Sequence, residues 1–82
     1  MLTVYTKTNC RFCELAKGFL KIHKIPFHTW NIDFSDEAKA FLKERGHKTV
    51  PQFYVDDLLV VEGGYEGLTH LSQEQIDHLR GV

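Results

Sequence analysis

The sequence contains little of several features that mark large classes of protein. It has only two cysteines, two prolines, one methionine and one tryptophan among its 82 residues. No apolar run approaches the roughly 20 residues that a membrane-spanning helix needs. The formal net charge is -1, which argues against nucleic-acid binding driven by attraction to phosphates. We therefore expect neither a membrane nor a nucleic acid among the partners of this chain.

Targeting and repeat signals are also missing. The segment from Met1 to Thr8 lacks the basic region, the long apolar stretch and the small-residue cleavage site of a signal peptide. We therefore expect a cytoplasmic location. No internal repeat or low-complexity segment appears, and apolar residues make up 43% of the chain, which is ordinary for a globular protein. We expect residues 1–82 to form a single domain and the protein to be a monomer.

Hydrophobic spacing and turn residues predict four strands and three helices. The predicted strands are Leu2–Thr6, Phe27–Ile32, Gln52–Val55 and Leu58–Glu62. The predicted helices are Arg11–Lys24, the segment from Ser35 to Gly46, and a last helix whose apolar face is Leu68, Leu71, Ile76 and Leu79. Asp56-Asp57 suits a tight turn between the last two strands. Thr69 or Ser72 suits the N-terminal cap of the last helix.

The order β-α-β-α-β-β-α predicts an α/β fold. A helix joins the first two strands, which should therefore be parallel, whereas the last two should form an antiparallel hairpin. Helices on both faces of a four-stranded mixed sheet would bury the available apolar residues. The buried side of the first helix is predicted from residues with helical spacing: Leu15, Ala16, Phe19, Leu20 and His23.

The only two cysteines, Cys10 and Cys13, stand two residues apart in "TNCRFCELAKGFL". A structural disulfide is disfavoured, because a reducing compartment does not maintain one and so short a loop restrains little chain entropy. A zinc site would need two more ligands, and the nearest histidines, His23 and His28, do not follow zinc-finger spacing. The structural disulfide and the zinc site both remain open as alternatives, but redox chemistry at the two cysteines is favoured.

The position of the cysteines suits two different roles. Cys10 follows a predicted strand and begins a predicted helix, where unpaired N–H groups and the helix dipole favour a thiolate. Lys7 and Arg11 add positive charge nearby in the sequence. The pKa of Cys10 should therefore lie below that of a free thiol, and the thiolate is the attacking species in disulfide exchange. Cys13, almost one helical turn later, can resolve a mixed disulfide formed at Cys10.

With these residues placed, the chain resembles a glutaredoxin from Val4 to about Leu79. Three motifs carry the resemblance: Cys10-Arg11-Phe12-Cys13, Thr49-Val50-Pro51-Gln52, and Gly63-Gly64 before the last helix. The resemblance implies a thioredoxin-like fold and a glutathione-dependent thiol–disulfide oxidoreductase that binds no metal or other cofactor. It also implies that glutathione and disulfide-containing proteins are partners, with ribonucleotide reductase as a client.

The resemblance further implies a substrate site beside the cysteines. Pro51 would be cis and would face Cys10, and Val50 would offer its backbone to an extended substrate. Lys7 or Lys48 would pair with the glycine carboxylate of glutathione. Phe12 should be exposed beside the sulfurs. The full set implied for glutathione binding is Lys7, Arg11, Phe12, Lys48, Thr49, Val50, Pro51, Gly63, Gly64, Tyr65 and Glu66.

Two departures from the family pattern bear on this assignment. Arg11-Phe12 stands where many glutaredoxins have Pro-Tyr between the cysteines. Gly67 stands where many relatives have an acidic or hydroxyl residue that grips the γ-glutamyl amine, so only Glu66 could serve. A glutaredoxin-like protein reduced by thioredoxin reductase is therefore the close alternative. A non-catalytic zinc-binding or interaction module on the same fold is the alternative from a different class.

Overall fold

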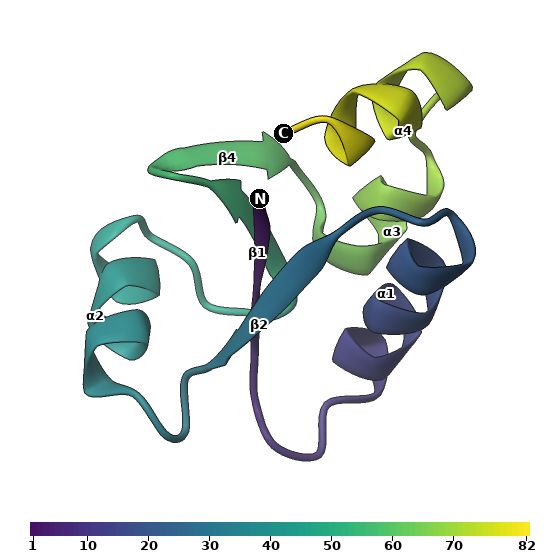
Figure 1. Ribbon diagram of the computed structural model, residues 1–82. Coiled ribbons are helices and arrows are strands. Elements are labelled where there is room, and N and C mark those ends of the chain that lie inside the picture. The colour runs from purple at the N-terminus through teal and green to yellow at the C-terminus, as the bar shows by residue number, and fades with distance from the viewer.

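Four strands form one mixed sheet in the computed structural model, which describes residues 1–82 (Figure 1). Their order is β2-β1-β3-β4. Strand β1 (Leu2–Thr6) is parallel to β2 (Phe27–Asn31) and antiparallel to β3 (Gln52–Val55), which forms a hairpin with β4 (Leu58–Val61). The predicted parallel pair and the predicted hairpin are therefore confirmed.

The first two helices begin where the sequence predicts. Helix α1 (Arg11–Ile22) starts after Cys10, and helix α2 (Asp36–Glu44) starts after Ser35. The Ser35 hydroxyl accepts a hydrogen bond from the Ala38 N–H at 3.1 Å, which satisfies a donor that the helix itself leaves free. Gly46 follows α2 with φ +81, a left-handed conformation that glycine adopts at little cost.

One face of the sheet packs against three helices. Strand β1 contributes Leu2 and Val4, and these side chains pack with Leu20 of α1. Leu68 and Leu79, from the C-terminal helices, complete this cluster. Figure 1 shows the C-terminal helices on the same side of the sheet as α1, with α2 on the other side. The placement of helices on both faces is therefore confirmed. The prediction that Leu15 belongs to the buried side of α1 is wrong, since its side chain is 40% exposed.

The predicted last helix is two helices. Helix α3 (Gly64–Thr69) ends before Leu71, and helix α4 (Gln73–Arg80) starts after Ser72. Ser72 caps α4: its hydroxyl accepts the Gln75 N–H at 3.2 Å, while its own N–H donates to Gln75 Oε1 at 2.8 Å. Residues 70–72 separate the two helices. Ile76 follows Leu71 at i+5, a spacing that does not keep two residues on one helix face. The fold thus has four helices, not the predicted three.

The other face of the sheet packs against α2 through a smaller, aromatic cluster. Tyr5 of β1 and Tyr54 of β3 are buried against Ala38 and Leu42 of α2. The rings of Tyr5 and Phe41 stack with centroids 5.3 Å apart. Burial raises the pKa of the Tyr5 phenol, and the nearby Tyr54 acts in the same direction.

This raised pKa predicts a loss of stability in alkaline solution. The folded state favours neutral Tyr5, so its contribution is complete below the ordinary tyrosine pKa of about 10 and is lost as the pH rises through the folded value. We expect the free energy of unfolding to fall above pH ~10, and to fall less steeply in Tyr5→Phe. Urea unfolding of both proteins across this range measures the difference. Equal slopes in the two proteins would contradict the assignment to Tyr5.

None of the helices combines the length and the apolar character that crossing a bilayer would require.

Candidate redox site

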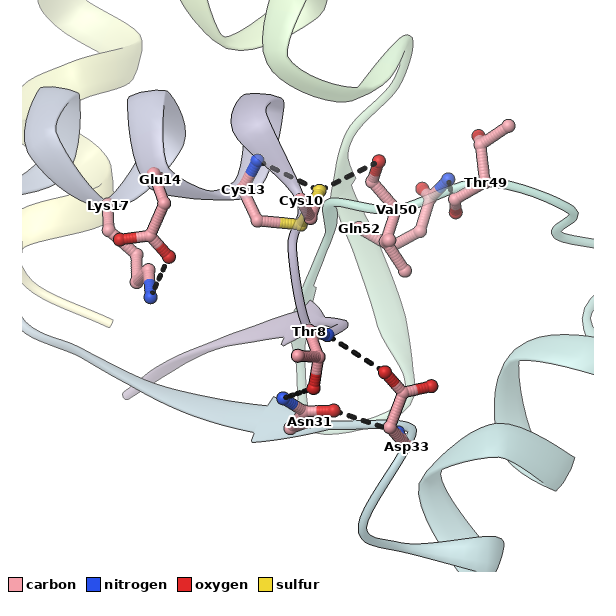
Figure 2. The surroundings of a disulfide bond; sticks show 10 residues. All are labelled: Thr8, Cys10, Cys13, Glu14, Lys17, Asn31, Asp33, Thr49, Val50 and Gln52. Atoms are coloured by element: carbon pink, nitrogen blue, oxygen red, sulfur yellow. Dashed lines mark hydrogen bonds and ion pairs between the residues drawn. A yellow bond between two sulfur atoms is a disulfide. The ribbon is translucent and has the colours of Figure 1, made fainter.

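The two cysteines lie at the N-terminus of α1 and form a disulfide (Figure 2). Cys10 is the N-cap residue, and its Sγ accepts a hydrogen bond from the Cys13 N–H at 3.1 Å. Cys10 retains 7% of its exposure, whereas Cys13 is completely buried. An attacking molecule can therefore approach the sulfur of Cys10 but not that of Cys13.

The loop that carries Thr49, Val50 and Pro51 faces the disulfide. The Val50–Pro51 peptide bond is cis, as the resemblance implies. The Val50 carbonyl oxygen lies 3.9 Å from Cys10 Sγ and points toward it in Figure 2. The Gln52 side chain donates a hydrogen bond to the Thr49 carbonyl oxygen at 3.0 Å, which ties the loop to the start of β3. The predicted proximity of this loop to Cys10 is thus confirmed.

A pocket of about 430 Å³ lies along this loop and brings together many of the implied glutathione contacts. The predicted residues among its lining are Phe12, Thr49, Val50, Pro51, Gly63, Gly64, Tyr65 and Glu66. They come from α1, the cis-proline loop and the start of α3, which the tertiary fold places next to one another. Neither cysteine is among the lining residues of this pocket, but Phe12 and Val50 connect it to the disulfide. A larger hollow of about 980 Å³ between β4 and α4 contains none of the residues implied for glutathione binding.

Two aromatic rings form one wall of the pocket. The Phe12 and Tyr65 ring centroids are 6.1 Å apart, and their planes are tilted by 31°. Phe12 is 58% exposed, which confirms its predicted position at the surface beside the cysteines. The pair offers an apolar surface to whatever occupies the pocket.

The predicted basic contacts lie outside this lining. Lys7, Arg11 and Lys48 are all exposed, and none of them lines the pocket. Their charged groups are exposed to solvent, so salt screens their attraction for charges that lie more than about one Debye length away. Any contact of theirs with a substrate therefore requires a side chain to reach over the rim of the pocket.

Sequence reasoning missed three lining residues: His47, Gln52 and Leu59. Gln52 belongs to the motif that carried the resemblance, and its buried side chain supports the loop. His47 lies two residues before Thr49, and its Nε2 is 2.6 Å from the hydroxyl of Tyr54. The position of His47 close to the Thr49 motif could have predicted its place in the pocket. It was not predicted, because five histidines are scattered along the chain.

Gly67 occupies a position where no side chain fits. A Cβ built there would lie 1.7 Å from the Glu62 carbonyl oxygen. The close approach joins the end of β4 to the first turn of α3. The missing acidic or hydroxyl side chain at this position is therefore a requirement of the local packing.

No group of three or more histidine, cysteine, aspartate or glutamate side chains is arranged to hold a metal ion.

Comparison with known proteins assigns the chain to a family. A sequence model described as Glutaredoxin matches residues 2–60, which is more than half of the chain. The chain belongs to the glutaredoxin family. It is thus a thiol–disulfide oxidoreductase with Cys10 and Cys13 as its cysteine pair.

Relatives of this glutaredoxin-family chain include both glutaredoxins and glutaredoxin-like proteins. The glutaredoxin-like protein NrdH of Lactococcus lactis subsp. cremoris is 39% identical over 57 residues, covering 70% of this chain and 79% of the relative. A probable glutaredoxin of Synechocystis is 37% identical over 79 residues, covering 93% and 71%. The structure of NrdH-redoxin from Escherichia coli matches with a TM-score of 0.73 at 24% identity, covering 95% and 92%, and confirms the thioredoxin-like fold.

Proposed function

We propose that this glutaredoxin-family protein reduces protein disulfides and glutathione mixed disulfides, with Cys10 as the attacking sulfur and Cys13 as the resolving sulfur. The observation that carries the proposal is the unequal exposure of the pair at the N-terminus of α1. The Cys13 N–H already donates to Cys10 Sγ, and the same donor would stabilise a Cys10 thiolate in the reduced protein.

The reaction takes two exchange steps. The Cys10 thiolate attacks one sulfur of the substrate disulfide, forms a mixed disulfide and releases the other sulfur as a thiolate. Cys13, once deprotonated, attacks Cys10 Sγ and releases the second substrate thiol, so two electrons have moved to the substrate. The pair is then oxidised, as it is in this structure. Two molecules of glutathione would return it to the dithiol and become glutathione disulfide.

Glutathione as the reductant is supported by the composition of the pocket. Its volume of about 430 Å³ lies within the ordinary range for small-molecule sites. Val50 offers backbone groups beside Cys10, and Glu66 places a carboxylate among the lining residues. That carboxylate would accept hydrogen bonds from the γ-glutamyl ammonium group of glutathione.

Thioredoxin reductase as the electron source is the second candidate, and a specific observation favours it. Packing excludes any side chain at Gly67, and the basic side chains expected for the glycine carboxylate lie outside the pocket lining. The relatives point the same way: one is named glutaredoxin-like protein NrdH, and the Escherichia coli NrdH-redoxin is described as having a thioredoxin-like activity profile. With either donor, the proposed clients are disulfide-containing proteins of the cytoplasm such as ribonucleotide reductase.

Glu66→Gln separates the two electron sources. It removes the only carboxylate that lines the pocket, while Glu62→Gln removes an exposed carboxylate outside the lining and serves as the control. If glutathione is the substrate, Glu66→Gln should raise the KM for a glutathione mixed disulfide roughly 5-fold to 20-fold, the cost of replacing a charge-assisted hydrogen bond by a neutral one. A single turnover in which the pre-reduced protein reduces uncharged hydroxyethyl disulfide, with no glutathione present, should change little.

Turnover of the glutathione mixed disulfide is measured twice, once with glutathione as the only reductant and once with thioredoxin reductase as the only reductant. Turnover with glutathione and a KM effect confined to Glu66→Gln would support the first candidate. Turnover with thioredoxin reductase alone, and no KM effect of Glu66→Gln, would support the second.

A further inference from the structure

The loop that delivers Cys10 to the site has little backbone hydrogen bonding of its own. Lys7, Thr8 and Asn9 connect β1 to α1; Thr8 and Asn9 form a turn, and none of the three makes a well-aligned backbone–backbone hydrogen bond within 3.5 Å. All three are exposed, and Asn9 has a left-handed backbone with φ +56. Asparagine tolerates this conformation better than most residues, but it still needs support from its surroundings. The position of Cys10 therefore depends on groups outside the loop. On the helix side, the Glu14 N–H donates to the Cys10 carbonyl oxygen at 3.1 Å.

Side chains at the end of β2 supply that support (Figure 2). The Thr8 N–H donates to Asp33 Oδ2 at 2.9 Å, and Asn31 Nδ2 lies 3.5 Å from the Thr8 hydroxyl oxygen. The backbone N–H of Asp33 donates to Asn31 Oδ1 at 2.8 Å, which fixes the Asn31 side chain relative to the Asp33 backbone. We call Thr8, Asn31 and Asp33 the loop clamp. Its strongest contact joins a backbone donor to a carboxylate, a type of hydrogen bond that is stronger than a neutral one.

The parallel pairing of β1 and β2 brings the clamp together. Parallel strands end at the same edge of a sheet, so the segments that follow β1 and β2 leave side by side. The Ile32 N–H donates to the Thr6 carbonyl oxygen at 2.8 Å and extends the ladder by one bond beyond β2. Asp33 follows directly and meets Thr8, which is two residues before Cys10. The clamp thus links the sulfur to the sheet.

We propose that Asp33 is a positioning residue for disulfide exchange: its hydrogen bond to the Thr8 backbone holds Cys10 where the N-terminus of α1 stabilises its thiolate. The inference rests on the proposed role of Cys10 as the attacking sulfur. The contact at stake is the 3.1 Å hydrogen bond from the Cys13 N–H to Cys10 Sγ. If the loop relaxes, Cys10 moves away from that donor, the thiol pKa rises and less thiolate is present at neutral pH.

Two effects of Asp33 on Cys10 have opposite signs, and this makes the proposal testable. The negative charge by itself disfavours a nearby thiolate, whereas the hydrogen bond favours it through the loop. Asp33→Asn removes the charge but keeps an oxygen that can accept the Thr8 N–H. Asp33→Ala removes both the charge and the acceptor. Asp36→Ala removes one exposed carboxylate three residues later and serves as the charge control.

The experiment measures the Cys10 pKa from alkylation rate against pH in the full-length protein. It also measures the rate of a single turnover in which the pre-reduced Cys10–Cys13 dithiol reduces hydroxyethyl disulfide and becomes the disulfide. Asp33→Ala should raise the Cys10 pKa and lower the thiolate fraction at pH 7 about 5-fold to 10-fold. The rate should fall less, by about 2-fold to 4-fold, because a thiolate of higher pKa is the stronger nucleophile. Asp33→Asn and Asp36→Ala should stay within about twofold of the parent. Asn31→Ala, which keeps the carboxylate but removes its support, should give a smaller effect in the same direction as Asp33→Ala.

Three outcomes would overturn the proposal. The first is an Asp33→Ala protein with the parent pKa and rate, and the second is an Asp33→Asn protein that behaves like Asp33→Ala. If Asp33→Ala does not fold, Asn31→Ala takes its place in the test. The third outcome is then an Asn31→Ala protein with the parent pKa and rate. Because a single turnover of the pre-reduced protein contains neither glutathione nor a reductase, these results do not depend on the identity of the electron donor. If Cys10→Ser retained activity, the proposed function itself would fail, which is a separate result.

Discussion

Cys10→Ser is expected to abolish disulfide reduction with every substrate, because it removes the sulfur that a substrate can reach. Cys13→Ser should retain the reduction of glutathione mixed disulfides, which needs one thiolate, and should lose the reduction of protein disulfides, which needs a second. The unequal exposure of the two residues, 7% for Cys10 and 0% for Cys13, is the physical basis of this division. Turnover of a glutathionylated peptide and of a protein disulfide by each variant measures it.

The intermediate gives an independent check on these roles. In Cys13→Ser the mixed disulfide at Cys10 cannot be resolved from within the protein, so it should accumulate with a protein substrate and appear in intact-mass spectra. The Cys10→Ser protein should form no such adduct. Equal loss of activity in both variants with all substrates, or an adduct formed mainly through Cys13, would contradict the assignment.

Gly67→Ala is expected to destabilise the fold by about 1–3 kcal/mol or more, the range for forcing extra atoms into a packed site. A Cβ at this position would lie 1.7 Å from the Glu62 carbonyl oxygen and 2.8 Å from its carbonyl carbon. Both atoms belong to the backbone, so no side-chain rotation can relieve the contact, and the end of β4 must separate from α3. Urea denaturation followed by circular dichroism measures the loss.

Gly18→Ala is the matched control for this substitution. Gly18 lies within α1, and a Cβ there would have no atom within 4 Å. Its helical backbone suits alanine, so the change should stabilise the protein by about 0.5–1 kcal/mol. If Gly67→Ala proved as harmless as Gly18→Ala, the close approach of Glu62 to α3 would not exist in solution. Acidic or hydroxyl residues at position 67 should then be tolerated too.

Local chemistry in the sequence was sufficient to determine much of this protein. The strands follow from short segments bounded by turn residues, although β2 and β4 each end one residue before the predicted end, and the start of α2 follows from the Ser35 cap and its acidic first turn. The position of Cys10 at a helix start follows from its place between a strand pattern and a helix pattern. These features are local, so they need only the few residues on either side.

The division of the last helix was not predicted, although its signals are local. Ser72 and Gln75 form the capping box that starts α4, and Ser72 was already a candidate cap in the sequence.

Other features depended on segments that are far apart in the sequence. The sequence did not show that Lys7, Arg11 and Lys48 lie outside the pocket lining, or that His47 lies within it. The close approach at Gly67 and the contact between Thr8 and Asp33 were likewise visible only after folding. Each of these is set by how strands and helices pack against one another, and the distances that result are properties of the tertiary structure alone.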